Sequence, residues 1–124
     1  MDTPVEDLNT AVLAGTLSSD PREVVLESGS RLVRLEVTTR VAADEPADTV
    51  PVAWFDPPAS APALLRGDAV VVTGKVRRRW FGASGAARSA PEVVAATVVP
   101  ASRRAAARKA VASALASLQA GQGA

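Results

Sequence analysis

The stretch from Val33 to Thr38, VRLEVT, alternates apolar and polar side chains. Neighbouring side chains of an extended chain point to opposite faces, so this alternation separates an apolar face from a polar one. The apolar face holds Val33, Leu35 and Val37, and the polar face holds Arg34, Glu36, Thr38 and Arg40. A helix would mix the two kinds of side chain around its surface. The pattern therefore predicts a half-buried strand over about residues 30–40.

Other short apolar segments, each bounded by turn residues, recur along the chain. They are Asn9–Leu17, which Arg22–Glu27 could extend, then Asp48–Phe55, Asp68–Phe81 and Pro91–Pro100. Gly15 inside the first of them indicates a bulge or a close backbone approach, and residues 57–68 hold a short helical turn at most. Together the segments predict an all-β domain, a five-stranded OB-fold, which is a partly open barrel. Another small β-barrel or a sandwich would also fit the pattern.

The tail from residue 101 to residue 124 is rich in alanine, the strongest helix former. Val111, Leu115 and Leu118 follow helical spacing and form a narrow apolar stripe. We predict a helix over about residues 101–120, whose stripe packs on the barrel or on a second subunit. Its basic residues either contact phosphates or face solvent. The chain thus divides into a flexible arm (1–8), the OB-fold domain (9–100) and a helical tail (101–124).

The chemistry open to the chain is narrowed by its lack of cysteine and histidine. Disulfides, thiol catalysis and Cys-bound metals are excluded, and the commonest general base and zinc ligand are missing. The carboxylates of Asp20, Asp56 and Asp68 show no paired spacing, and Asp20 and Asp68 fit turns. We therefore expect neither an enzyme nor a cofactor. An acidic N-terminus and the lack of a long apolar run predict a cytoplasmic protein without a membrane partner.

Charge is divided unevenly between the two halves of the chain. Residues 1–56 hold eleven acidic residues and four arginines, whereas residues 57–124 hold two acidic residues and ten basic ones. The halves carry −7 and +8, and the net charge is +1. A basic second half suggests a surface that binds a polyanion. The alternative is that the two halves neutralise each other in the fold.

The basic residues gather most densely in GKVRRRWF, from Gly74 to Phe81. Strand alternation places Lys75, Arg77, Arg79 and Phe81 on one face. Arg78 and Trp80 fall on the face of Val70, Val72, Gly74 and Val76, where an unpaired charge is costly. We therefore expect the strand to leave the barrel near Arg78, so that both faces become accessible.

Five pieces of the chain, in order, resemble the bacterial single-stranded-DNA-binding protein family. They are NTAVLAGTLSSDP (9–21), SGSRLVRLEVTT (28–39), DTVPVAW (48–54), LLRGDAVVVTGKVRRRWF (64–81) and EVVAATVV (92–99). The chain is most similar to the short, divergent actinobacterial-type paralogues of that family. The resemblance implies an OB-fold that binds single-stranded DNA without reading its sequence, in replication, repair or recombination. RNA is the alternative ligand, and a homo-oligomer, dimer or tetramer, is implied.

Two departures from the family pattern weaken what the resemblance implies. The chain ends in LQAGQGA and lacks the family's acidic, hydrophobic tip, so partner recruitment through such a tip is not expected. The family stacks bases on three or four rings, which only Trp54 and one of Trp80 or Phe81 match by position. The rings late in the second strand and early in the third are missing. We therefore expect a weaker stacking surface.

Non-sequence-specific binding of a single strand requires cations for phosphates and flat rings for bases. The residues that meet this requirement are Arg34, Arg40, Trp54, Lys75, Arg77, Arg78, Arg79, Trp80 and Phe81. Two alternatives remain: Trp54 fits a core position at period two from Val50 and Val52, and Arg77–Arg79 fit a solvated strand end. The competing function is an OB-fold protein-interaction module that has largely lost DNA binding.

Overall fold

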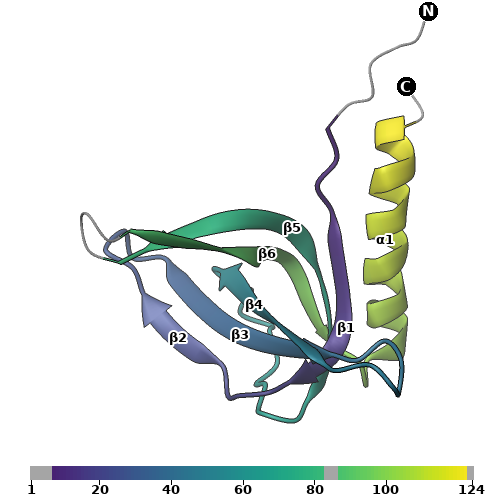
Figure 1. Cartoon of the computed structure of the whole chain (residues 1–124), viewed down its shortest axis with the longest axis horizontal. Helices are drawn as coiled ribbons and strands as arrows, with labels where there is room; N and C mark the ends of the chain where they lie inside the picture. The colour runs from purple at the N-terminus through teal and green to yellow at the C-terminus, as the bar shows by residue number, and fades with distance from the viewer. Residues whose placement is uncertain (1–6, 83–86, 123–124) are drawn as a thin grey trace, which may run out of the picture.

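The computed structural model describes residues 7–82 and 87–122, with side chains for residues 7–82 and 87–119. The predicted flexible arm, residues 1–8, lies mostly outside these residues. The elements are β1 (Ala11–Leu17), β2 (Arg22–Val25), β3 (Arg31–Thr39), β4 (Asp48–Phe55), β5 (Ala69–Phe81), β6 (Arg88–Pro100) and α1 (Arg104–Gln122). The fold is therefore mostly β with one C-terminal helix, as predicted (Figure 1).

The six strands form one sheet in the order β1-β5-β6-β4-β3-β2. A further pairing between β1 and β3, through Thr16 with Thr38 and Leu17 with Val37, closes five of the strands into a ring (Figure 1). β2 remains at the edge, paired only with β3, and its four residues are exposed. The five strands predicted from the sequence are thus the five strands of the ring. Arg22–Val25, which the sequence offered as a possible extension of the first strand, forms a separate sixth strand.

Gly15 makes the ring closure possible. A Cβ atom at this position would collide with the backbone carbonyl of Thr38 on β3. The close approach that the sequence indicated at Gly15 is confirmed.

We expect Gly15→Ala to lower the free energy of unfolding by about 1–3 kcal/mol, because two backbones would have to separate. Urea unfolding followed by circular dichroism measures the change. Ala14→Ser adds one heavy atom at the neighbouring exposed position and should have little effect. If both variants unfold at the urea midpoint of the wild type, the β1–β3 contact is looser than the structure indicates.

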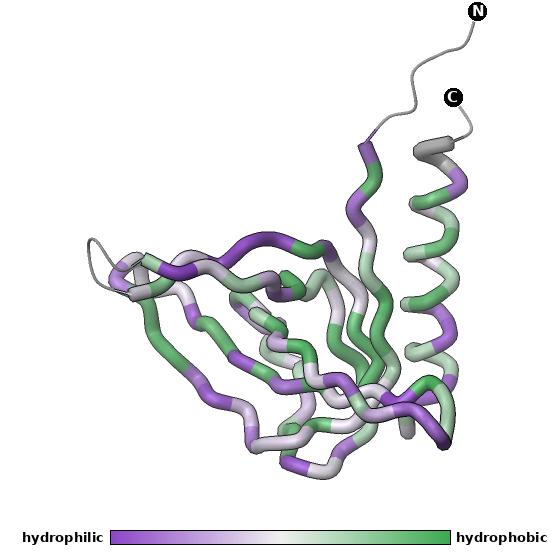
Figure 2. The backbone as a smooth tube through the Cα atoms, in the orientation of Figure 1, coloured by the Kyte–Doolittle hydropathy of each residue, from purple (hydrophilic) through white to green (hydrophobic). Residues whose placement is uncertain are grey.

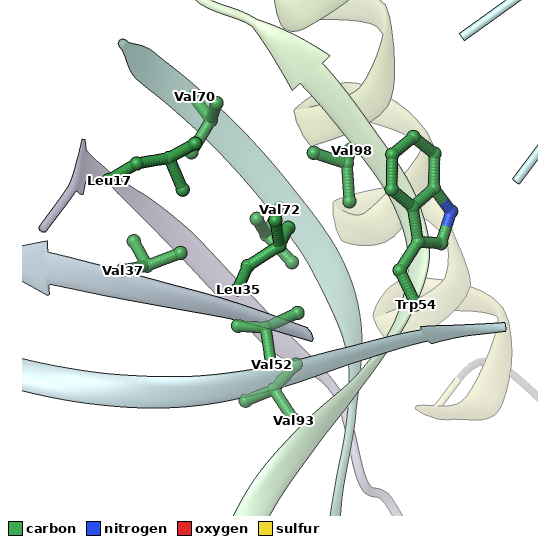
Figure 3. Packing of buried hydrophobic residues seen from close by; sticks show 9 residues of the cluster. All are labelled: Leu17, Leu35, Val37, Val52, Trp54, Val70, Val72, Val93 and Val98. Atoms are coloured by element: carbon green, nitrogen blue, oxygen red, sulfur yellow. The ribbon is translucent and has the colours of Figure 1, made fainter. Parts of the chain in front are cut away.

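The core fills the inside of the ring. It consists of Leu17, Leu35, Val37, Val52, Trp54, Val70, Val72, Val93 and Val98 (Figure 3). Leu35 and Val37 come from the predicted apolar face of β3, along which hydrophobic and hydrophilic residues alternate in Figure 2. Val70 and Val72 lie on the face of β5 that was predicted to be buried, so these assignments are confirmed.

β5 leaves the ring earlier than predicted. Its pairing with β1 ends at Gly74, whereas its pairing with β6 continues to Phe81 and Arg88. The expectation that the strand departs near Arg78 is wrong, because β1 begins at Ala11, opposite Gly74, and offers no partner to the residues beyond it. The register shift against β6 lies at the same point, between Thr73 and Gly74. A Cβ atom at Gly74 would collide with the carbonyl of Val94, so glycine is required there.

Beyond Gly74, residues Lys75–Phe81 of β5 pair only with Arg88–Val94 of β6, and we call this hairpin the β5–β6 arm (Figure 1). All residues from Lys75 to Phe81 are exposed or nearly so. Val76, predicted to face the core, is 45% exposed. Asn9 takes the place of a strand partner at the base of the arm: its side-chain amide donates to the Val76 carbonyl and accepts from the Val76 N–H, at 2.6 and 2.9 Å.

Residues 57–68 agree with the sequence-based prediction, whereas one further strand boundary differs from it. Residues 57–68, expected to hold a helical turn at most, contain turns and no helix. β6 begins at Arg88 rather than at Pro91, because Arg88, Ser89 and Ala90 continue the ladder with β5. Residues 83–86, between these two strands, lie outside the described part of the chain.

Helix α1 contacts the outer face of β5 and β6 (Figure 1). It rests on the sheet mainly through Ala107 and Ala114, which are the buried residues of its described part. Of the predicted stripe, Val111 and Leu118 are half-buried, but Leu115 is 53% exposed. The helix is confirmed, while packing of the whole stripe on the sheet is not. Within the described residues, no helix combines the length and the apolar character needed to cross a membrane.

Candidate nucleic-acid interface

A hollow of about 330 Å³ opens between the β5–β6 arm and strands β3 and β4. Its lining comes from four separate parts of the chain. We call it the basic hollow, and it is lined by Leu26, Leu32, Arg34, Phe55, Arg77, Arg78, Arg79 and Trp80. Five of these residues, namely Arg34, Arg77, Arg78, Arg79 and Trp80, were predicted from the sequence as a nucleic-acid site.

Strand register brings these residues together. Arg34 on β3 lies opposite Ala53 on β4, Ala53 pairs with Val94 on β6, and Arg77 on β5 lies opposite Glu92 on β6. Side chains at paired positions share a face of the sheet. Arg34, Glu92 and Arg77 therefore lie side by side on the outer face, although 58 residues separate Arg34 from Glu92 in the sequence.

Glu92 is the buried centre of this group. Its side chain is 1% exposed, and its Oε2 atom accepts from Arg77 Nε at 2.9 Å and lies 2.8 Å from Arg77 Nη2. Arg34 Nη1 approaches the other oxygen, Oε1, at 3.6 Å, too far for a hydrogen bond, and Oε1 has no hydrogen-bond partner among the described residues. A buried carboxylate requires such partners. Glu92 is therefore held mainly by its hydrogen-bonded ion pair with Arg77, and the longer contact with Arg34 is the weaker of the two.

The basic hollow carries more positive charge than Glu92 balances. Burial lowers the pKa of the Arg34 guanidinium, and the neighbouring charge of Arg79 lowers it further, with smaller contributions in the same direction from Arg22 and Arg77. Glu92 acts in the opposite direction on this pKa but does not outweigh those effects. Arg34 thus sits among like charges, which an anionic ligand would relieve.

The rings near the basic hollow differ in accessibility. Trp80 is 68% exposed, so its indole is open to a ligand. The Phe55 ring lies under the Arg77 guanidinium, whose Cζ atom is 5.0 Å from the ring centroid. Phe81, which does not line the hollow, is 42% exposed and is approached by Arg79 at 5.6 Å in the same way. Such cation–π pairs attract the guanidinium to the face of the ring.

Trp54 does not belong to this surface. It is 7% exposed and packs in the core, so its assignment as a stacking ring is wrong. Its neighbour Phe55 points to the outer face instead, because adjacent residues of β4 alternate. The sequence motif WF placed a ring here but did not show which of the two faced outward. Leu26 and Leu32, which complete the lining, carried no signal of a binding role.

Arg40, Lys75 and Phe81 also lie outside the basic hollow. Arg40 follows the end of β3, six residues beyond Arg34, and donates to the Glu45 carbonyl at 3.0 Å. Lys75 faces the helix, where it lines a larger hollow of about 620 Å³ between α1 and strands β5 and β6. The structure does not bring these two cations to the other predicted residues.

The isolated carboxylates have structural partners. Asp20 accepts from the Arg66 N–H, Asp68 from the Leu65 N–H and Asp56 from the Arg31 N–H, each at 2.8 Å. The interpretation of Asp68 as a turn residue is confirmed, because its partner Leu65 lies three residues before it. Asp20 instead joins the segment between β1 and β2 to the distant Arg66. Within residues 7–82 and 87–122, no cluster of three Asp or Glu side chains is arranged to hold a metal ion.

No protein-family model matches the chain, and no curated protein is significantly similar to it in sequence. The resemblance to the single-stranded-DNA-binding family stays a prediction from the sequence motifs.

Proposed function

We propose that this protein binds single-stranded DNA, independently of sequence, through the basic hollow and the exposed face of the β5–β6 arm. One observation carries the proposal: Arg34, Arg77, Arg78, Arg79 and Trp80, from two distant strands, line a single hollow. A site that combines arginines with an open ring suits a flexible polyanion with exposed bases. The same chemistry would accept single-stranded RNA, which the test below includes.

The closed ring of five strands supports our reading of the fold as an OB-type barrel. In such barrels, ligands lie across one face and against the hairpins that project from it. The β5–β6 arm is such a hairpin, and the basic hollow lies at its inner side. We place the protein, by this proposal, in a process that exposes single strands, such as DNA replication, repair or recombination.

Phosphate contacts would supply most of the affinity. Each base stacked on a ring contributes roughly 1–3 kcal/mol, and Trp80 is the ring of the hollow whose face is open. With three to four phosphates neutralised, raising salt from about 50 to about 200 mM should weaken binding about 20- to 50-fold. Strong salt dependence with modest stacking is therefore the expected signature.

Titration with oligo-dT under these two salt conditions, followed by tryptophan fluorescence, tests the proposal. We expect quenching from Trp80, and a Trp80→Phe variant should bind with little quenching because Trp54 is buried. A parallel titration with oligo-U shows whether RNA binds as well. Absence of binding to either strand at the lower salt would contradict the proposal and favour the protein-interaction module.

A further inference from the structure

We propose that Arg77 is a stacking surface for an unpaired base rather than a phosphate ligand. This inference rests on the proposed function and refines it, because it separates the adjacent arginines of the arm into two roles. Arg77 would hold the base by its guanidinium plane, and Arg78 and Arg79 would hold the phosphates by their charge.

The charge of Arg77 is already engaged by a buried partner. Two of its nitrogens, Nε and Nη2, lie 2.9 and 2.8 Å from Glu92 Oε2. Glu92 is shielded from solvent, since its side chain is 1% exposed and lies beside Arg34 and Arg77. A phosphate approaching Arg77 would therefore compete with a fixed carboxylate. This competition leaves little net charge for counterion release.

The position of Arg77 is constrained by a ring as well. Its Cζ atom lies 5.0 Å from the centroid of the Phe55 ring, so the ring occupies one side of the guanidinium. The side chain is nevertheless 43% exposed and lines the basic hollow. A base entering the hollow would meet the opposite face and complete a layered arrangement of ring, guanidinium and base. Guanidinium planes stack on bases in this way.

The neighbouring arginines lack the buried carboxylate partner, although Arg79 also lies over a ring, 5.6 Å from the Phe81 centroid. Arg78 donates to the hydroxyl of Ser89 at 2.7 Å, which is uncharged, and no carboxylate lies within ion-pair distance of Arg78 or Arg79 among the described residues. Their charges remain available to phosphates. A base on Arg77 would also offset the scarcity of open rings, since Trp54 is in the core and Phe55 is covered.

The test compares Arg77→Lys with the control Arg103→Lys, at an exposed position that does not line the basic hollow. Both are measured on two ligands: oligo-dT and an abasic strand of equal length and charge. Lysine keeps the charge but has no plane. We expect Arg77→Lys to weaken oligo-dT binding about fivefold or more, the lower limit for one lost stack. Its salt slope and its binding to the abasic strand should match the wild type. Arg103→Lys should bind both strands as the wild type does.

Equal weakening of Arg77→Lys on both strands, or no weakening on oligo-dT, would overturn the inference while leaving the proposed function intact. Failure of the wild type to bind oligo-dT would instead contradict the proposed function. Thermal unfolding shows whether Arg77→Lys stays folded. If it does not, Glu92→Gln replaces it, because this change weakens the contact that holds the Arg77 guanidinium. A freed guanidinium should weaken the binding of oligo-dT only. Tighter binding to both strands would show that Arg77 is a phosphate ligand.

Discussion

Arg78→Ala combined with Arg79→Ala should lower the affinity for oligo-dT by about 20- to 30-fold at about 0.1 M salt, because two phosphate contacts are lost. The slope of log K against log salt should become shallower by about 1.4, the value for two contacts on a single strand. Fluorescence titration over a range of salt concentrations measures both quantities. Neither side chain is in the core, so the fold should be retained.

Arg40→Ala combined with Arg103→Ala is the matched control for that experiment. It removes the same charge from exposed positions that do not line the basic hollow. A general attraction by net charge would weaken both double variants equally. Binding localised in the hollow would leave the control within about threefold of the wild type, since long-range effects of exposed charges are screened. Equal losses would show that our site is misplaced.

Trp54→Ala should lower the free energy of unfolding by about 3–5 kcal/mol, as removal of a large buried ring does. Trp54 is 7% exposed and packs with Val52 and Val98 in the core (Figure 3). Urea unfolding followed by circular dichroism measures the loss. A change of this size is a large part of the stability of a small domain.

Trp80→Ala makes the same substitution on the 68% exposed ring of the arm. We expect stability within about 0.5 kcal/mol of the wild type, with oligo-dT binding weaker by about 1–3 kcal/mol from the lost stack. Trp54→Ala should therefore affect mainly the free energy of unfolding, whereas Trp80→Ala should affect mainly the binding of oligo-dT. Equal stability losses would mean that the arm packs against the rest of the protein more than the structure shows.

The β3 strand and the C-terminal helix were predictable because each pattern depends on local spacing. Val33, Leu35 and Val37 alternate with polar residues, and an alanine-rich tail has little alternative to a helix. Trp54 and Phe55 were not separable in the same way. Both are aromatic and adjacent, and the face that each occupies depends on how β4 pairs with β3 and β6.

The position of the arm also depended on tertiary contacts. The sequence showed that charge begins at Lys75, but the departure of β5 at Gly74 follows from the length of β1 and from the register shift against β6. Nothing in the sequence around Glu92 indicated that its side chain would be buried or would bind an arginine. Only its place opposite Arg77, and near Arg34, makes it the buried centre of the basic hollow.

By itself, the sequence determined the kinds of element, the absence of cysteine and histidine chemistry, and the concentration of cations and rings in Gly74–Phe81. These are properties of composition and spacing, which need no long-range contact. The tertiary structure alone decided which cations share one hollow, which tryptophan is buried, and which arginine is neutralised. Each of those outcomes depends on strand pairing between residues far apart in the chain, and register assigns every side chain to a face.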